Sequence, residues 1–256
     1  MNKVYIFDVD GTLTPSRLPM TKEFRKFFKE WVKTNTFYLV TGSDIEKLQE
    51  QMCEMEIHSS GIFTCCGNQF WQSDAAVHPK HADLIYDNKF EMSSKLKNAL
   101  DVMLISSQYE HRYGNHIEDR GSMVNFSIVG RDCTQEQREE YFKWDNENGE
   151  RKKISTFLKH KFPELDAVIG GQISIDIYPK GKDKSQILEH IKDRNIVTSK
   201  DEYIFIGDRT MKGGNDYPLA KLMEETDNCK FHQVEGYRKT WWLLQRYELG
   251  LETIID

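Results

Sequence analysis

Three short apolar runs, each followed at once by a polar turn, constrain the fold of this chain most strongly. Residues 4–7 (VYIF) precede DVDGT, residues 37–40 (FYLV) precede TGSD, and residues 203–206 (YIFI) precede GDRT. Runs of this length and composition are typical of strands that are buried on both faces of a parallel sheet. Because the carboxyl ends of parallel strands lie at one edge, where ligands bind, we expect the three polar turns to meet there.

Helical patterns lie between and after these runs. Apolar residues at helical spacing from Phe24 to Val32 predict a helix between the first two strands, which completes a β-α-β unit. After the second run, Ser43 and Glu46 have the spacing of a capping box at the start of the next helix. Residues 237–249 (YRKTWWLLQRYEL) predict an amphipathic helix that packs on the core, with a contact to a partner as the alternative.

The middle of the chain has a different pattern. Helical stretches near residues 94–106 and 134–144 stand among alternating segments at residues 123–128 and 173–178. This mixture predicts an α+β domain that is inserted into a parallel-sheet core. The predicted division is residues 1–81 and 184–256 for the core and residues 82–183 for the insertion.

The composition excludes several classes of protein. A hydrophobic content of 38% with 30% charged residues is typical of a globular protein and not of a disordered chain. The net charge of −6 gives no overall attraction to a polyanion, so nucleic acid is not an expected partner. No apolar run approaches the ~18 residues of a membrane span, and no signal peptide precedes the first strand. The five cysteines, odd in number and without a CxxC spacing, predict reduced thiols and a cytoplasmic location.

The turn after the first apolar run carries the strongest chemical signal. Residues 7–14 (FDVDGTLT) place two carboxylates, Asp8 and Asp10, at the end of a strand. In this arrangement Asp8 can attack phosphorus as a nucleophile, while Asp10 moves the proton of the entering or leaving oxygen. A magnesium ion would neutralise the charge between carboxylate and phosphate. The alternative is an acidic turn that only caps a helix, which the strand context disfavours.

The turn after the third run supplies further acidic residues. Asp208 is the expected ligand of Mg²⁺ together with Asp8 and Asp10, because hard cations bind carboxylate oxygens. Asn215 and Asp216 are expected to orient these ligands without binding the ion directly. A helix cap is the alternative role for Asp216.

Uncharged and cationic donors complete the predicted site. Thr41 and Ser43, which follow the second run, can donate hydrogen bonds to a phosphoryl oxygen. The competing role for Ser43 is the helix cap described above. Lys184 can neutralise the aspartyl-phosphate, as cationic groups do in phosphoryl transfer.

These residues resemble the four motifs of the haloacid dehalogenase (HAD) superfamily, and longer blocks resemble the eukaryotic-type phosphomannomutases. The blocks are FDVDGTLTPSR, TGSDIEKLQEQM, NFSIVGRDCTQEQREEY, GGQISIDIYPKGKDK and GDRTMKGGND. The resemblance implies a HAD-type, Rossmann-like α/β core with an inserted α+β cap of the C2b type. It also implies an intramolecular phosphotransferase that interconverts mannose 6-phosphate and mannose 1-phosphate for GDP-mannose synthesis. Mg²⁺, a hexose 1,6-bisphosphate activator and a homodimer formed through the cap are further implications.

The resemblance also implies which residues hold the hexose phosphate substrate. The matching positions are Arg17, Arg120, Arg131, Arg138, Ser174 and Asp176. Guanidinium groups match phosphate oxygens in geometry, although a single arginine can equally belong to a solvated helix face or a turn. At two positions where the family has ligands for a second cation, this chain has Ala220 and Leu222, which puts that second site in doubt; Thr226 and Asp227 are the possible substitutes.

Three functions remain open at this point. A phosphomannomutase ranks first, because it accounts for the nucleophile and the arginines together. A HAD-type sugar-phosphate phosphatase, or a phosphoglucomutase activity, would use the same nucleophile on a related substrate. A non-catalytic binding protein ranks last, because both Asp8 and Asp10 are present.

Overall fold

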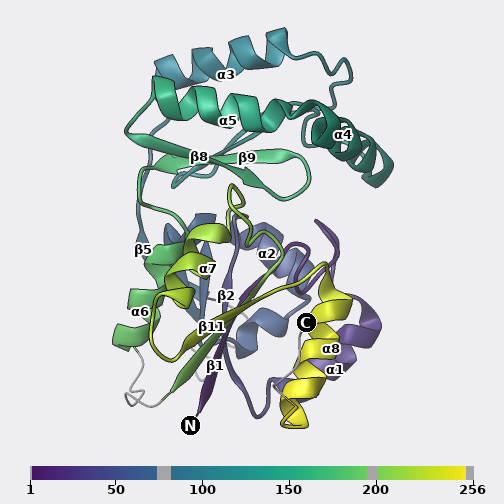
Figure 1. Ribbon diagram of the computed structural model, residues 1–256, viewed down its shortest axis with the longest axis vertical. Helices are drawn as coiled ribbons and strands as arrows, with labels where there is room; N and C mark the ends of the chain where they lie inside the picture. The colour runs from purple at the N-terminus through teal and green to yellow at the C-terminus, as the bar shows by residue number, and fades with distance from the viewer. Residues whose placement is uncertain (1, 74–81, 195–200, 252–256) are drawn as a thin grey trace.

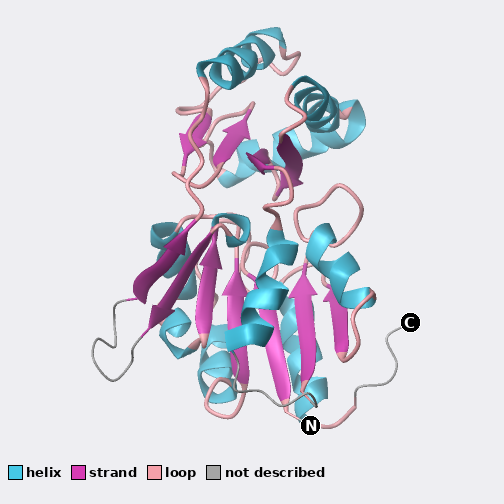
Figure 2. Ribbon diagram, turned by 90° about the vertical axis from the view of Figure 1, so that its left-hand side faces the viewer, coloured by secondary structure: helices cyan, strands magenta, loops and turns pink. Residues whose placement is uncertain are grey.

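The computed structural model describes residues 2–73, 82–194 and 201–251, which form two sheets (Figure 1). The larger sheet has seven strands in the order β11-β10-β1-β2-β3-β4-β5, and the smaller has four in the order β6-β7-β9-β8. Figure 2 shows the smaller sheet and its helices above the end of the larger sheet to which the strand arrows point. The carboxyl ends of the parallel strands therefore face the second domain. No helix of the described residues is long and apolar enough to cross a membrane.

The predicted buried strands lie side by side at the centre of the larger sheet. Its parallel strands are β1 (Lys3–Asp8), β2 (Thr36–Val40), β3 (Gly61–Thr64), β10 (Glu202–Gly207) and β11 (Cys229–Gln233), and its antiparallel strands are β4 (Gln69–Ser73) and β5 (Ala82–Asp87). In this register Phe7 of β1 is opposite Leu39 of β2 on one side and Ile206 of β10 on the other. The three polar turns consequently emerge at neighbouring positions, as predicted.

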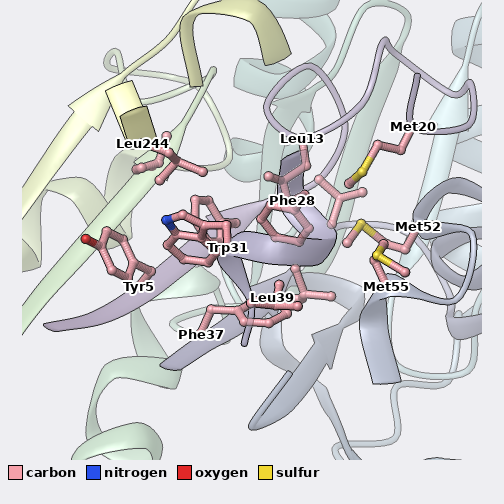
Figure 3. Close-up of a cluster of buried hydrophobic side chains, with 14 of the residues drawn as sticks. Tyr5, Leu13, Met20, Phe28, Trp31, Phe37, Leu39, Met52, Met55 and Leu244 are labelled. Atoms are coloured by element: carbon pink, nitrogen blue, oxygen red, sulfur yellow. The ribbon is translucent and has the colours of Figure 1, made fainter. Parts of the chain in front are cut away.

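Helices cover both faces of this sheet. They are α1 (Lys22–Trp31), α2 (Ile45–Met52), α6 (Ile187–Arg194), α7 (Tyr217–Glu224) and α8 (Tyr237–Glu248), with short 3-10 turns η1 (Met55–His58), η2 (Cys65–Gly67) and η3 (Lys184–Gln186). Alternate residues of β1 point to opposite faces: Tyr5 packs with α1 and α8, and Ile6 packs with α6 and α7. Figure 3 shows Trp31 of α1 between Tyr5 and Phe28, with Leu244 of α8 close by. The C-terminal helix thus packs on the core, which confirms that prediction.

The second domain is the predicted α+β insertion, and we call it the cap. Its elements are β6 (Ile117–Asp119), β7 (Val124–Ser127), β8 (Leu165–Gly170), β9 (Ser174–Pro179), α3 (Ser94–Ser106), α4 (Gln135–Asn148) and α5 (Glu150–Lys161). Val124 and Phe126 of β7 pack in the apolar core of the cap, whereas Asn125 between them lines a pocket on the other face. Both faces of β7 are buried, because the polar face of the cap sheet is turned toward the larger sheet.

Two local predictions were wrong. Residues 82–87 pair with β4 in the larger sheet, so the chain enters the cap after Asp87 and not at residue 82. This antiparallel edge strand exposes Leu84 and Ile85 and therefore lacks the continuous buried run that marks a parallel strand. The cap of α2 is Asp44, whose side chain accepts a hydrogen bond from the backbone N–H of Lys47, and not Ser43.

Candidate active site

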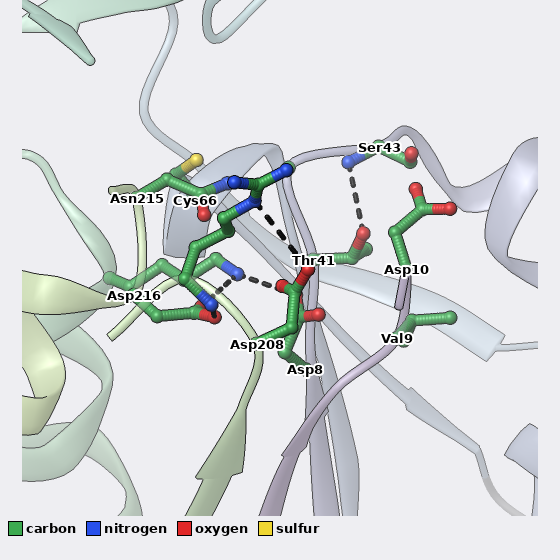
Figure 4. Close-up of polar contacts among 12 residues, drawn as sticks. Asp8, Val9, Asp10, Thr41, Ser43, Cys66, Asp208, Asn215 and Asp216 are labelled. Atoms are coloured by element: carbon green, nitrogen blue, oxygen red, sulfur yellow. Dashed lines mark hydrogen bonds and ion pairs between the residues drawn. The ribbon is translucent and has the colours of Figure 1, made fainter. Parts of the chain in front are cut away.

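Three carboxylates and one ammonium group gather where β1 and β10 end (Figure 4). Asp8, Asp208 and Asp216 each offer an oxygen within 4.8 Å of the others. The Nζ of Lys184 donates to Asp8 Oδ1 and to Asp216 Oδ1, each over 2.6 Å, and this side chain is fully buried. Lys184 therefore fixes the orientation of Asp8 against the loop that carries Asp216.

Burial gives this cluster unusual acid-base properties. It raises the pKa of Asp8 well above the ordinary value, against the opposing effect of the Lys184 ammonium group, and the Asp216 carboxylate raises that pKa further. Burial and the same Asp216 charge raise the pKa of Asp208 to about 7. Lys184 and, beside Asp208, Arg209 thus compensate three carboxylates, and additional positive charge would lower the pKa of both Asp8 and Asp208.

The donor set fits a hard divalent cation. Asp8 Oδ2 is buried and accepts no hydrogen bond from any described residue, whereas the oxygens of Asp216 are engaged by Lys184 and by the backbone N–H of Arg209. Gly11 allows the first turn to approach Asp208, because a Cβ at this position would lie 2.6 Å from Asp208 Oδ2. Asp8 and Asp208 are therefore the residues that would hold Mg²⁺, with Asp216 as an orienting group.

Asp10 lies outside this acidic cluster. Its Oδ1 accepts hydrogen bonds from Gln51 Nε2 at 2.8 Å and from the backbone N–H of Arg17 at 2.5 Å. In Figure 4 it stands to one side of Asp8, on the same pocket wall. These hydrogen bonds fix the side chain of Asp10 at the pocket wall, and its predicted roles in proton transfer and as a metal ligand stay predictions. Sequence reasoning missed Gln51. The available signal was its position on the buried face of α2.

A pocket extends from the carboxylates to a group of arginines from both domains. All the predicted site residues line it except Lys184 and Asp216, which lie buried beneath it. Ser16, Asn125 and Gln172 also line this pocket and were not predicted. The structure therefore brings together Arg17 from the core with Arg120, Arg131 and Arg138 from the cap; these four are the arginine cluster.

The arginine cluster contains one carboxylate that sequence reasoning missed, Glu118 of β6. Glu118 Oε2 accepts a hydrogen bond from Arg120 Nη2 at 2.6 Å, and its Oε1 lies 3.0 Å from Arg131 Nε. Although burial raises the pKa of Glu118, these two guanidinium groups lower it to about 2. Burial and the charge of Arg17 lower the pKa of Arg131 to about 10. Glu118 is the carboxylate that pairs directly with the cluster, while Asp10 acts on Arg17 and Arg138, and Asp176 on Arg120, at longer range. The clustered guanidinium groups suit an anion.

Hydrogen bonds between the domains close the cap over the core. The guanidinium group of Arg120 donates to the carbonyl oxygen of Gly42. Asn215 Nδ2 donates to Asp176 Oδ2 at 3.2 Å, and the backbone N–H of Ile169 donates to the carbonyl oxygen of Gly213 at 3.2 Å. The remaining cavity measures about 50 Å³, well below the ~300 Å³ at the lower end of small-molecule sites. The cap must therefore move to admit a sugar phosphate.

The positions that bear on a second cation site lie in and just after α7. Ala220 is buried and Leu222 half-buried in the apolar cluster on that face of the sheet. The Oγ1 of Thr226 donates to the carbonyl oxygen of Leu222 at 2.6 Å, so it points back to the last turn of α7. Within the described ranges, Asp8, Asp208 and Asp216 form the group of three or more possible metal ligands.

Solved structures with a similar overall fold define the class to which the fold of this chain belongs. An IMP-bound, N-terminally truncated IMP-nucleotidase from Plasmodium falciparum superposes with a TM-score of 0.63 at 15% identity, over 97% of this chain and 68% of that one. A haloacid dehalogenase-like hydrolase from Bacteroides thetaiotaomicron superposes with a TM-score of 0.61 at 13% identity, over 96% of this chain and all of the other (100%). The fold is therefore of the HAD type, as predicted.

Sequence relatives narrow this class to one family. The profile of the eukaryotic phosphomannomutases matches residues 24–237. The phosphomannomutase of Encephalitozoon cuniculi is 33% identical over 252 residues, which cover 96% of this chain and 95% of the relative. That of Drosophila melanogaster is 36% identical over 217 residues, 84% of each chain. This chain belongs to the eukaryotic phosphomannomutase family, which confirms the resemblance drawn from its motifs.

Proposed function

We propose that this chain is a phosphomannomutase that interconverts mannose 6-phosphate and mannose 1-phosphate, with GDP-mannose synthesis as its general role. The observation that carries the proposal is that one pocket holds both groups a mutase needs. The nucleophilic carboxylate of Asp8 and the four guanidinium groups of the arginine cluster line it together. A mutase substrate carries a phosphate at each end during the reaction, whereas a simple phosphatase has no use for a second grip.

The arginine cluster is proposed to hold the phosphate that does not react. Guanidinium groups bind phosphate oxygens by paired, charge-assisted hydrogen bonds. Ser174, which accepts a hydrogen bond from Arg131 Nη1 at 2.8 Å, and Asp176 are proposed to bind the sugar or to orient these arginines. Thr41 and Ser43 line the pocket near Asp8 and are proposed donors to the reacting phosphoryl group.

In the acidic cluster, Asp8 attacks phosphorus of a hexose 1,6-bisphosphate, which forms the aspartyl-phosphate and releases a hexose monophosphate. Asp10 protonates the leaving oxygen and, in the return step, removes the proton of the attacking hydroxyl group. Lys184 keeps Asp8 oriented and offsets the charge that accumulates beside it. Mg²⁺, held by Asp8 and Asp208, would supply further charge neutralisation.

Exclusion of water distinguishes the proposed mutase from the phosphatase alternative. Water that reaches the aspartyl-phosphate hydrolyses it, and the transferred group is then lost as free phosphate. The contacts of Arg120 with Gly42 and of Asp176 with Asn215 hold the cap against the core and restrict the cavity. A closed cap therefore favours transfer to a sugar hydroxyl over transfer to water.

A homodimer through the cap belongs to the same proposal. Helix α3 exposes apolar side chains on the outer side of the cap, with Val102 55% and Ile105 85% exposed. Contiguous exposed apolar residues of this kind mark protein interfaces. Sedimentation at micromolar concentration should therefore report a dimer that Ile105→Glu dissociates. A cytoplasmic location is also proposed, in keeping with five cysteines that are all free thiols.

The experiment that tests the function is phosphorus NMR of the purified protein with Mg²⁺, mannose 1-phosphate and a trace of glucose 1,6-bisphosphate. We expect the mannose 6-phosphate signal to grow while free phosphate stays minor. Growth of free phosphate alone would assign the chain to the phosphatases. A parallel run with glucose 1-phosphate measures the preference between the two hexoses.

A further inference from the structure

A second cavity, of about 620 Å³, adjoins the active-site pocket. It lies between the loop after β1, helix α4 of the cap and the start of α8. Ser16, Gln172 and Asp208 line both cavities, so the two spaces are adjacent and share walls. We call the larger space the vestibule. It is much roomier than the 50 Å³ that the closed pocket leaves.

Three cationic side chains from two separate elements, Arg209, Arg238 and Lys239, line the vestibule and outnumber its two carboxylates, Asp208 and Glu235. The guanidinium group of Arg209 lies over the ring of Phe142 at 5.5 Å, which holds it at the boundary between core and cap. Its Nε is buried, lies 3.5 Å from Asp208 Oδ2, and donates no hydrogen bond to a described residue. Arg209 therefore has donor capacity that the protein itself leaves unused.

The start of α8 presents cations to the vestibule. Arg238 and Lys239 stand in its first turn, which contains no acidic residue, and no side chain caps this helix end, although Glu235 just before the helix also lines the cavity. A helix N-terminus carries partial positive charge, so an anion bound there would be stabilised by the helix end and by both side chains. The chain as a whole has a net charge of −6. The group of cationic side chains beside the catalytic carboxylates thus contrasts with the negative charge of the whole chain.

A mutase reaction creates a need for such a site. Between the two transfers, the bisphosphate must exchange the phosphate held by the arginine cluster for the one beside Asp8. The closed pocket has no room for this rotation. If the bisphosphate were released into solution, the enzyme would lose its activated intermediate. We propose that the vestibule is a phosphate-binding subsite, which retains one phosphate of the hexose 1,6-bisphosphate while the intermediate turns. This inference rests on the proposed function.

The test removes charge from the vestibule without touching the buried site. Arg238→Gln/Lys239→Gln changes two exposed residues of α8, and Lys152→Gln/Lys153→Gln is the matched control with two adjacent exposed lysines on α5. The measured quantity is the amount of hexose bisphosphate released per mannose 6-phosphate formed, by quenched-flow sampling and phosphorus NMR. We expect this ratio to rise at least ~5-fold in the α8 variant, which corresponds to about 1 kcal/mol of lost retention.

The outcomes separate this inference from the function on which it rests. If the ratio in the α8 variant equals that of the wild type and of the control, the vestibule does not retain the intermediate. If only the concentration of glucose 1,6-bisphosphate needed for half-maximal activation rises, the cations guide entry, and the proposed turning role is wrong. If the wild type forms no mannose 6-phosphate although it becomes phosphorylated on Asp8, the proposed function itself fails.

Discussion

Replacement of Glu118 by glutamine tests whether this carboxylate holds guanidinium groups together that would otherwise repel one another and bind an anion. The wild-type carboxylate is the one acid that pairs with Arg120 and Arg131 among the described residues. Glutamine keeps the size and one acceptor but removes the charge. The variant then holds these guanidinium groups close together without the carboxylate that pairs with them directly, and a bound phosphate can replace the lost charge.

The structure sets the expected magnitude. The pKa of Glu118 lies at about 2 against an ordinary 4.5, because the two guanidinium groups outweigh the effect of burial. This difference corresponds to ~3.4 kcal/mol in favour of the folded, ionised form. Since the side chain is 29% exposed, solvent screens part of this energy. We expect the variant to lose about 2 kcal/mol of stability at pH 7, which lowers the melting temperature by about 4–8 °C.

The pH dependence has a defined sign. A carboxylate whose folded pKa is depressed contributes its full stabilisation above pH 4.5 and loses it as the pH falls toward 2. The difference in stability between wild type and Glu118→Gln should therefore be constant from pH 7 to 5 and shrink below that. Urea unfolding at several pH values measures it. A difference that stays constant down to pH 3 would assign the loss to packing and refute the electrostatic explanation.

Phosphate provides the second arm of the same test. Because phosphate replaces the missing charge, it should stabilise the variant more than the wild type, with binding tighter by about 3- to 10-fold. Calorimetric titration with inorganic phosphate checks this directly. Equal or weaker binding by the variant would mean that Glu118 orients Arg120 and Arg131 and that its charge does not compete with the ligand.

Four further predictions concern the core and the site. Asp8→Asn should lower both mutase and phosphatase rates by at least ~10³-fold, since an amide is a poor nucleophile; steady-state assays with Mg²⁺ check it. Arg138→Ala should lower kcat/KM for mannose 1-phosphate by ~30-fold, about 2 kcal/mol, and affect acetyl phosphate hydrolysis much less; equal losses would contradict a distal-phosphate role. Leu244→Ala, at a fully buried position of α8, should cost about 3 kcal/mol in urea unfolding. Burial, together with the charge of Lys230, lowers the pKa of His232 to about 4. The wild type should therefore lose stability as the pH falls from 6.5 to 4. His232→Gln should lose about 1–2 kcal/mol less over this range, after allowance for partial exposure.

The elements predicted best were those whose signal is local. Runs such as residues 4–7 and 203–206 are apolar throughout because helices cover both faces of the strand, and this pattern is readable without a structure. Residues 82–87 gave no such signal, because an antiparallel edge strand is paired by tertiary context and exposes part of its surface. Ser43 was predicted as the cap of α2 from its capping-box spacing, but Asp44 is an equally good cap one residue later and is the one that the structure uses.

The residues of the site also divide into those with a local sequence signal and those without one. The carboxylates of Asp8 and Asp208 were predictable because each follows a buried strand, and parallel strands end at one edge. The arginine cluster was not predictable from spacing, since Arg17 and Arg138 are brought together only when the cap closes; family resemblance supplied them. Glu118 and Gln51 were missed because each acts on another side chain of the site, and such a role depends on the final packing.

Strand β9 connects the arginine cluster with the catalytic core. Ser174 and Asp176 are two residues apart and therefore project from the same face of the strand. Ser174 accepts a hydrogen bond from Arg131, whereas Asp176 accepts one from Asn215, next to Asp216 in the catalytic core. A phosphate bound by the arginine cluster would thus stabilise the cap position in which Asp176 reaches the core. A substrate without a distal phosphate gives no such stabilisation, so the cap would open more often, and water would compete for the aspartyl-phosphate on Asp8.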